Sequence, residues 1–189
     1  MSQPVYVVDL FAKIVADTQT AVLPILQAFN PAFTGVNFQA GHRLEISNTL
    51  LEWSKNSKDA DKFPMIALMM DFPEENGGIG NPTNLILQFA IATLTQPDWK
   101  LKDRNEKTLY PILYPIYHEF LRQIYYCGYF INSKAPKNIK IDRPLWGLQG
   151  ANGNTGNFFN DKVDIIEIQN LKLTTYGQCR RALGTVNFI

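Results

Sequence analysis

The stretch NLILQFAIATLT, residues 84–95, decides the fold class because its side chains alternate with a period of two. One parity carries Gln88 and two alanines, and the other carries large apolar side chains. These large side chains are Leu85, Leu87, Phe89 and Ile91. Successive side chains of a β-strand point to opposite faces of its sheet. The pattern therefore predicts a strand with one face against a core.

A second strand is expected just before it, where residues 63–72 contain the apolar run Met-Ile-Ala-Leu-Met-Met. A short apolar run of this kind is typical of a buried strand, and the two strands should pair antiparallel. The link between them, residues 73–83, holds Glu74, Glu75 and three glycines. It is longer than the roughly two to five residues of an ordinary hairpin turn, so it predicts a long, mobile β-arm.

The strongest helix signal lies beyond this strand pair, in residues 109–124. Apolar residues recur there at spacings of three and four, which places them on one face of a helix. Pro111 is acceptable near the first turn, whereas Pro115 should delay or kink the first regular hydrogen bonds. The charged stretch before it, residues 98–107, is expected to be a loop.

Two further helices are expected near the N-terminus. Apolar residues from Val7 to Val15 share one helical stripe. Pro24 leaves two alternatives for residues 22–29, either a kinked continuation of that helix or a second short segment. Residues 43–55 show helical spacing again, and His42 is placed to hydrogen-bond the first turn of that helix.

The C-terminal third predicts extended structure. Residues 137–147 read as a strand interrupted at Pro144, which confines that end to a sheet edge or a strand terminus. In residues 161–176 the apolar side chains change parity twice, which indicates either a β-bulge or burial on both faces. We therefore predict a single two-layer α+β domain over residues 1–176. Its mainly antiparallel sheet packs against two or three helices, with long loop extensions and a C-terminal arm at 177–189.

Composition restricts the function. The 189 residues include 18 basic and 17 acidic side chains, and a formal charge of +1 gives little reason for electrostatic capture of nucleic acid or an anionic membrane. Amides are abundant instead, with 16 Asn and 10 Gln. They form hydrogen bonds without the desolvation cost of a buried ion. We interpret this amide-rich surface as a protein interface; the alternative is that Asn simply fills turns.

Cysteine use and the apolar stretches point to a cytosolic chain. Cys127 and Cys179 form no CxxC pair and are expected to be buried free thiols. Prolines and glycines interrupt the two long uncharged stretches, residues 18–41 and 76–97, so neither is expected to span a bilayer. The N-terminus has no basic region of the kind that begins a signal peptide.

No catalytic or metal-binding pattern stands out, so the chain is predicted to be no enzyme and to need no cofactor. Neither His42 nor His118 has a Cys, Asp or Glu at a metal-ligand spacing, and His118 falls off the apolar stripe, as a surface histidine would. The acidic residues 161, 164 and 167 alternate between strand faces and do not converge. Three lysines at 134, 137 and 140 are better explained as a solvated edge than as a phosphate contact.

Four segments together resemble a known family. They are GHRLEI from Gly41, FPMIAL from Phe63, LYPILYPIY from Leu109 and NDKVDIIEI from Asn160. They resemble virion morphogenesis proteins of tailed bacteriophages and prophages of Bacteroidetes-type hosts. The order of elements is similar to that of phage tail terminator (tail completion) proteins.

The resemblance implies a non-enzymatic structural protein of the virion, assembled in the host cytoplasm. It implies a homo-oligomeric ring, commonly a hexamer, that joins the portal or connector to the tail or tail tube around the DNA channel. Contact with genomic double-stranded DNA would then be proximity without sequence specificity, and no membrane is involved. Another ring of the neck or connector is the alternative placement. The chain departs from compact terminators in its greater length and its C-terminal arm.

Loops and arms are the expected subunit contacts of such a ring. The candidate interface residues are Glu74, Glu75, Gly77, Gly78, Phe158, Phe159, Arg180 and Arg181. The two phenylalanines lie in a Gly/Asn loop and either tuck into their own core or anchor in the next subunit. A competing class is a small-ligand binding module in which residues 146–159 act as a lid.

Overall fold

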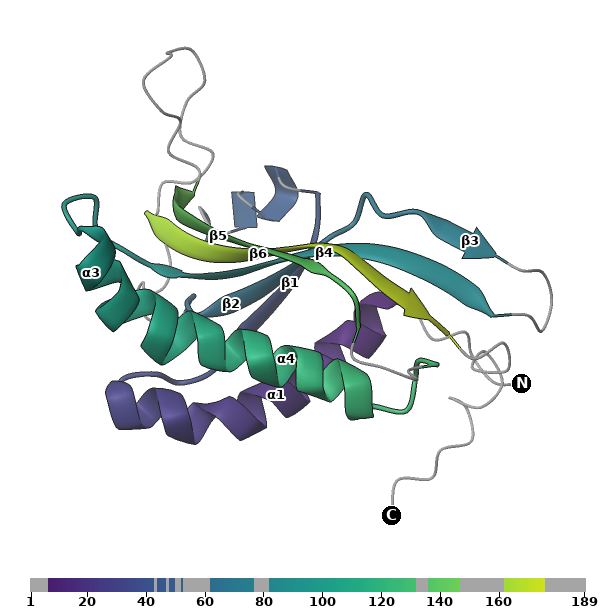
Figure 1. The fold of residues 1–189 in the computed structure, drawn as a ribbon, viewed down its shortest axis with the longest axis horizontal. Helices are drawn as coiled ribbons and strands as arrows, with labels where there is room; N and C mark the ends of the chain where they lie inside the picture. The colour runs from purple at the N-terminus through teal and green to yellow at the C-terminus, as the bar shows by residue number, and fades with distance from the viewer. Residues whose placement is uncertain are drawn as a thin grey trace, which may run out of the picture.

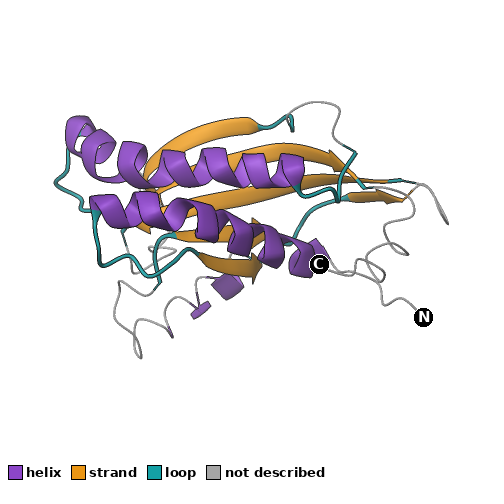
Figure 2. Cartoon of the chain, turned by 90° about the horizontal axis from the view of Figure 1, so that it is seen from below, coloured by secondary structure: helices purple, strands orange, loops and turns teal. Residues whose placement is uncertain are grey.

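The computed structural model describes residues 7–42, 44–46, 48–49, 52, 62–76, 82–131, 136–146 and 162–175. These residues form two layers, a twisted mixed sheet and a layer of helices that covers one of its faces (Figures 1 and 2). The predicted two-layer α+β class is confirmed.

The sheet has six strands, and its strand order is β1-β2-β4-β6-β5, with β3 paired to β4. The strands are β1 (Asn37–Gly41), β2 (Met65–Met69), β3 (Glu74–Asn76), β4 (Thr83–Leu94), β5 (Ile139–Trp146) and β6 (Val163–Thr174). All pairs are antiparallel except β1 with β2. Strand β1 is not predicted from local sequence patterns, because its parallel partner lies beyond the intervening residues 42–64.

The predicted antiparallel pair of β2 and β4 is confirmed, with Met65 opposite Ala92 and Leu68 opposite Phe89. The helix-facing side chains of β4 are buried in the main core as predicted. The expectation of only one buried face is wrong, because Ala90 and Ala92 are buried on the opposite side as well. On this second face the two alanines pack in a cluster with Val163 and Ile165 of the neighbouring strand β6 and with Ile46.

Both explanations offered for β6 hold. Val163 and Ile165 face the second cluster while Ile166 and Ile168 face the main core, so this half of the strand is buried on both faces. The pairing with β4 then shifts register between Leu87 and Phe89, and Asn170 adopts a left-handed φ of 52°. This bulge returns Leu171 and Leu173 to the helix face of the sheet.

β5 is an edge strand, as the proline predicted. Its pairing with β6 shifts register between Arg143 and Trp146, so Pro144 and Leu145 form a bulge. Leu145 has a φ of 50°, the second positive value among the described non-glycine residues.

The helix layer consists of α1 (Val7–Phe29) and a long helical segment made of α3 (Leu101–Arg104), the π-helical stretch η2 (Asn105–Leu113) and α4 (Tyr114–Tyr126). Helix α1 continues through Pro24, so the first of the two alternatives is correct. α1 and α4 pack against each other beneath the sheet (Figure 2). Four phenylalanines tie α1, β4, α4 and residue 130 together, with ring centroids 4.8 to 6.2 Å apart: Phe11, Phe89, Phe120 and Phe130.

The prediction of a loop over residues 98–107 is wrong, because the helix begins at Leu101. Asp103 caps the first turn of this helix: its Oδ2 accepts a hydrogen bond from the backbone N–H of Lys100 at 3.2 Å. The wider π-helical turns then carry Pro111 within the helix, and the N–H of Tyr114 donates to the carbonyl of Leu109, five residues back. Such turns accommodate the two prolines without ending the helix.

Candidate functional site

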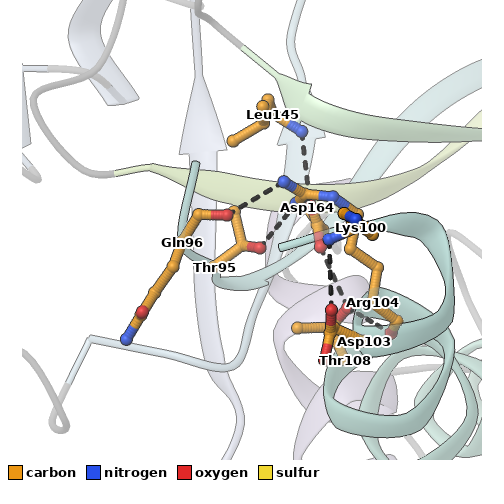
Figure 3. A network of polar contacts seen from close by, with 8 residues as sticks. All are labelled: Thr95, Gln96, Lys100, Asp103, Arg104, Thr108, Leu145 and Asp164. Carbon is orange, nitrogen blue, oxygen red and sulfur yellow. Dashed lines mark hydrogen bonds and ion pairs between the residues drawn. The ribbon is translucent and has the colours of Figure 1, made fainter. Parts of the chain in front are cut away.

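A fully buried ion pair joins the helix layer to the sheet. Arg104 of α3 is 5% exposed and Asp164 of β6 is 1% exposed. The Arg104 Nη1 donates to Asp164 Oδ1 at 2.6 Å and to Thr95 Oγ1 at 2.7 Å (Figure 3). Its Nη2 donates to the carbonyl of Gln96 at 2.9 Å.

The same carboxylate has two more donors. Thr108 Oγ1 lies 2.9 Å from Asp164 Oδ2, and the backbone N–H of Leu145 donates to Asp164 Oδ1 at 3.0 Å. Asp164 therefore links α3, η2 and the β5 bulge, as the converging dashed lines of Figure 3 show. A buried charge is stable in a protein only when it is paired and hydrogen-bonded. We therefore interpret this network as a structural contact that holds the helix layer to the sheet. Among the described residues, no buried side-chain nitrogen or oxygen of this network lacks a hydrogen-bond partner within the protein.

Sequence reasoning did not bring Arg104 and Asp164 together, since they lie 60 residues apart and the first was assigned to a loop. One signal was present. Asp164 stands between Val163 and Ile165 in an apolar strand, and aspartate is almost never fully buried without a partner. The prediction that the acidic residues of this strand do not converge is confirmed for Asp164 and Glu167, which bind different partners on opposite faces.

A second polar group lies on the face of the sheet away from the helices. Glu167 accepts a hydrogen bond from Gln88 Nε2 at 2.6 Å and forms a close ion pair with Arg143 Nε. Burial alone would raise the pKa of Glu167, but hydrogen bonds from Gln169, Arg143 and Gln88 outweigh it and hold the pKa below its usual value. The Arg143 side chain is 42% exposed, so its guanidinium reaches the solvent beside β5.

The third group lies where β5 meets α4. Lys140 Nζ is 2.6 Å from Asp142 Oδ1 and 4.2 Å from the ring centroid of Tyr114, whose hydroxyl donates to Asp142 Oδ2 at 2.9 Å. Burial opposes the charge of Lys140, yet hydrogen bonding and attraction to Asp142 raise its pKa overall. Burial and the bond to Asp142 likewise raise the pKa of the Tyr114 hydroxyl. This cation–π contact fixes Lys140 against the helix.

Both histidines lie where the sequence placed them. His42 Nδ1 accepts the backbone N–H of Leu44 at 3.2 Å, which confirms the predicted bond to the first turn of the following helix. Glu45 reciprocates by accepting the backbone N–H of His42 at 2.8 Å. His118 is exposed on α4, with its ring edge against Tyr117 at 5.1 Å.

Two of the predicted interface residues are described, Glu74 and Glu75, and both are exposed on β3. β3 takes up the start of the predicted 73–83 link, so the arm begins as paired strand and not as loop. The hairpin of β3 and β4 extends past the ends of α1 and α4 (Figures 1 and 2). The other predicted residues lie outside the described residues: Gly77, Gly78, Phe158, Phe159, Arg180 and Arg181.

Cys127 is a half-buried free thiol, and burial raises its pKa; Cys179 lies outside the described part of the chain. Within that part, no cluster of three or more His, Cys, Asp or Glu side chains is arranged to hold a metal ion. Among the described helices, none combines the length and the apolar character needed to cross a bilayer.

Comparison of the sequence with models of known protein families and with curated proteins found no match in either set.

Proposed function

We propose that this protein is a non-enzymatic structural component of a tailed-phage virion that forms a ring at the head–tail junction or the tail end. In this role it resembles a tail terminator and joins the portal or connector to the tail tube around the DNA channel. The observation that carries the proposal is the β3–β4 hairpin, which reaches beyond the helices of its own subunit (Figure 1). A strand pair held clear of the body is placed to contact a neighbouring copy.

Two features of the body support this role. The buried Arg104–Asp164 ion pair and its hydrogen bonds hold α3 against β6. Such a satisfied buried network makes the body of the subunit rigid, and the hairpin extends from that body. Among the described residues of the hairpin, the exposed charged side chains are Glu74 and Glu75, so an interface here needs only a few opposite charges on the neighbouring copy.

Multi-angle light scattering with electron microscopy tests the proposal. Purified protein, alone and mixed with candidate tail-tube proteins, is expected to give closed, ring-shaped particles with cyclic symmetry. The family resemblance leads us to expect a hexamer. Native mass spectrometry of the same sample checks the competing binding-module hypothesis. A monomer in every mixture, or a tightly held metabolite without a higher oligomer, would contradict the ring.

A further inference from the structure

Among the described residues, three strands of the sheet have a partner on one side only: β1, β3 and β5. β5 pairs with β6 on one side only, and β3 pairs with β4 on one side only. The unpaired N–H and C=O groups of an edge strand are a template for another strand.

The β3 and β5 edges carry opposite charge. Residues 63–97 contain no lysine or arginine, and their charged residues are Asp71, Glu74 and Glu75. The β5 region, residues 136–146, carries Lys137, Lys140 and Arg143 against the single acid Asp142. The third edge strand, β1, has the sequence NFQAG and no charge, so it offers the acidic hairpin no electrostatic partner.

The charges also match face by face. Glu74 stands opposite Leu85, a residue of the main core, and therefore lies on the helix side of the sheet, as Lys140 does beside Tyr114. Glu75 stands opposite Asn84 on the other side, the side where Arg143 meets Glu167. If the two strands joined one continuous sheet, each acid would share a face with a base.

Strand directions permit that junction. β5 runs antiparallel to β6, β6 antiparallel to β4, and β3 antiparallel to β4, so β3 and β5 run in opposite directions. Copies related by an axis along the strands keep these directions. The contact would therefore be antiparallel.

We infer that the acidic β3 edge of one copy pairs with the basic β5 edge of the next copy, so that the sheet continues from subunit to subunit. This inference rests on the proposed ring, and it identifies the β3 and β5 edges as the surfaces through which neighbouring subunits of that ring contact each other. The contact is head-to-tail, with different surfaces on its two sides.

Charge reversal tests the pairing. Glu75→Lys and Lys137→Glu, both at exposed positions, are each expected to weaken self-association by about tenfold, because like charges then face each other. The double variant Glu75→Lys/Lys137→Glu restores opposite charges across the junction and should recover assembly. Lys102→Glu is the matched control, since this lysine is 85% exposed on α3, at the other end of the molecule from β3 (Figure 1). It should assemble as the wild type does, and circular dichroism verifies that each variant is folded.

Cysteine cross-linking tests the geometry independently of ring stability. In a background with Cys127→Ser and Cys179→Ser, the pair Glu75→Cys and Ile139→Cys places both thiols on the face away from the helices. Oxidised glutathione should yield a ladder of disulfide-linked multimers from the double variant and none from either single variant. A dimer from a single variant would indicate a two-fold contact and overturn the inference.

The two experiments separate the inference from the proposed function. Rings that survive both charge reversals and give no cross-link would overturn the β3–β5 contact while leaving the ring intact. A wild-type chain that stays monomeric and gives no ladder would overturn both. A ladder without stable rings would support the contact and count against the ring.

Discussion

Asp164 occupies a position where an isolated carboxylate would be strongly unfavourable. It lies in the middle of an apolar strand, and three donors surround it: Arg104, Thr108 and the backbone of Leu145. Removing one partner of such a pair leaves the other charge buried and unpaired. The stability of the contact between α3 and β6 therefore depends on both charges together.

Asp164→Asn is expected to lower the free energy of unfolding by about 3–5 kcal/mol, because the Arg104 charge loses its counter-ion. Urea unfolding followed by circular dichroism measures the change. Asp142→Asn is the matched control; its ion pair with Lys140 is partly exposed, so the expected loss is within about 1 kcal/mol. Equal losses for the two variants would contradict the role assigned to Asp164. If Asp164→Asn does not fold, Thr108→Val keeps the ion pair and should cost about 1 kcal/mol.

Glu167 should make stability dependent on pH. Its pKa is lower in the folded state than in the unfolded chain, so the unfolded state binds more protons in acid. The stabilisation is complete above the unfolded pKa, near pH 4.3, and is lost as the pH falls through the folded pKa. Glu167→Gln removes this contribution. The difference in unfolding free energy between wild type and variant should therefore shrink from pH 7 to pH 3.

A matched variant identifies the source of that pH dependence. Arg143→Gln removes a hydrogen-bond donor and a positive charge from Glu167 and should reduce the same acid-dependent loss. Denaturant titrations at several pH values give both slopes. An unchanged slope in both variants would show that Glu167 does not control this part of the acid sensitivity.

At the scale of the element, the bulge in β6 decides which side chains reach the main core. The extra residue, Asn170, is exposed and adopts the left-handed conformation, which costs an ordinary L-residue roughly 1–2 kcal/mol and which Asn tolerates better than most. Without the bulge, the parity of Leu171 and Leu173 would turn both side chains away from the helices.

Asn170→Ala is expected to be about 1 kcal/mol less stable than Asn170→Gly, because only glycine adopts a positive φ without steric cost. Thermal or urea unfolding of the two variants measures the difference. Lys172 is the matched position on the same strand, exposed and without a positive φ. There the order should reverse, with glycine less stable than alanine. The same order at both positions would contradict the role of the left-handed conformation.

At the scale of the whole molecule, backbone protection should follow the position of each strand in the sheet. Among the described strands, β4 and β6 have partners on both sides, whereas β3 and β5 have one each. Exchange of an amide proton requires its hydrogen bond to open. The monomeric subunit should therefore exchange slowly along the middle of β4 and faster along β3 and β5.

Assembly is expected to slow exchange in β3 and β5 and to leave β1 unchanged. Hydrogen–deuterium exchange with mass spectrometry compares assembled wild type with the Glu75→Lys variant as the dissociated reference. Protection gained at β1 in place of β3 would identify a different sheet junction.

Local periodicity predicted most elements, but their burial was harder to predict. The alternation in residues 84–95 and the three-to-four spacing in residues 109–124 both report side-chain direction within a single element. The charged stretch before the second segment was misassigned because its helix buries Arg104 against the sheet, a contact that local spacing does not encode. For the candidate interface, the sequence predicted that Glu74 and Glu75 lie on an arm. That the basic residues of β5 lie at another edge of the same sheet could be seen only from the strand order.

By itself, the sequence determined the α+β class, the long helices, the β2–β4 pair, the edge position of β5 and the change of phase in β6. These features follow from spacing, proline and length, which act over a few residues. Tertiary structure alone decided the parallel β1–β2 pair, the second buried face, the Arg104–Asp164 ion pair and the opposite charges of the β3 and β5 edges. Each of these depends on residues far apart in the chain, and their contact is set by how whole elements pack.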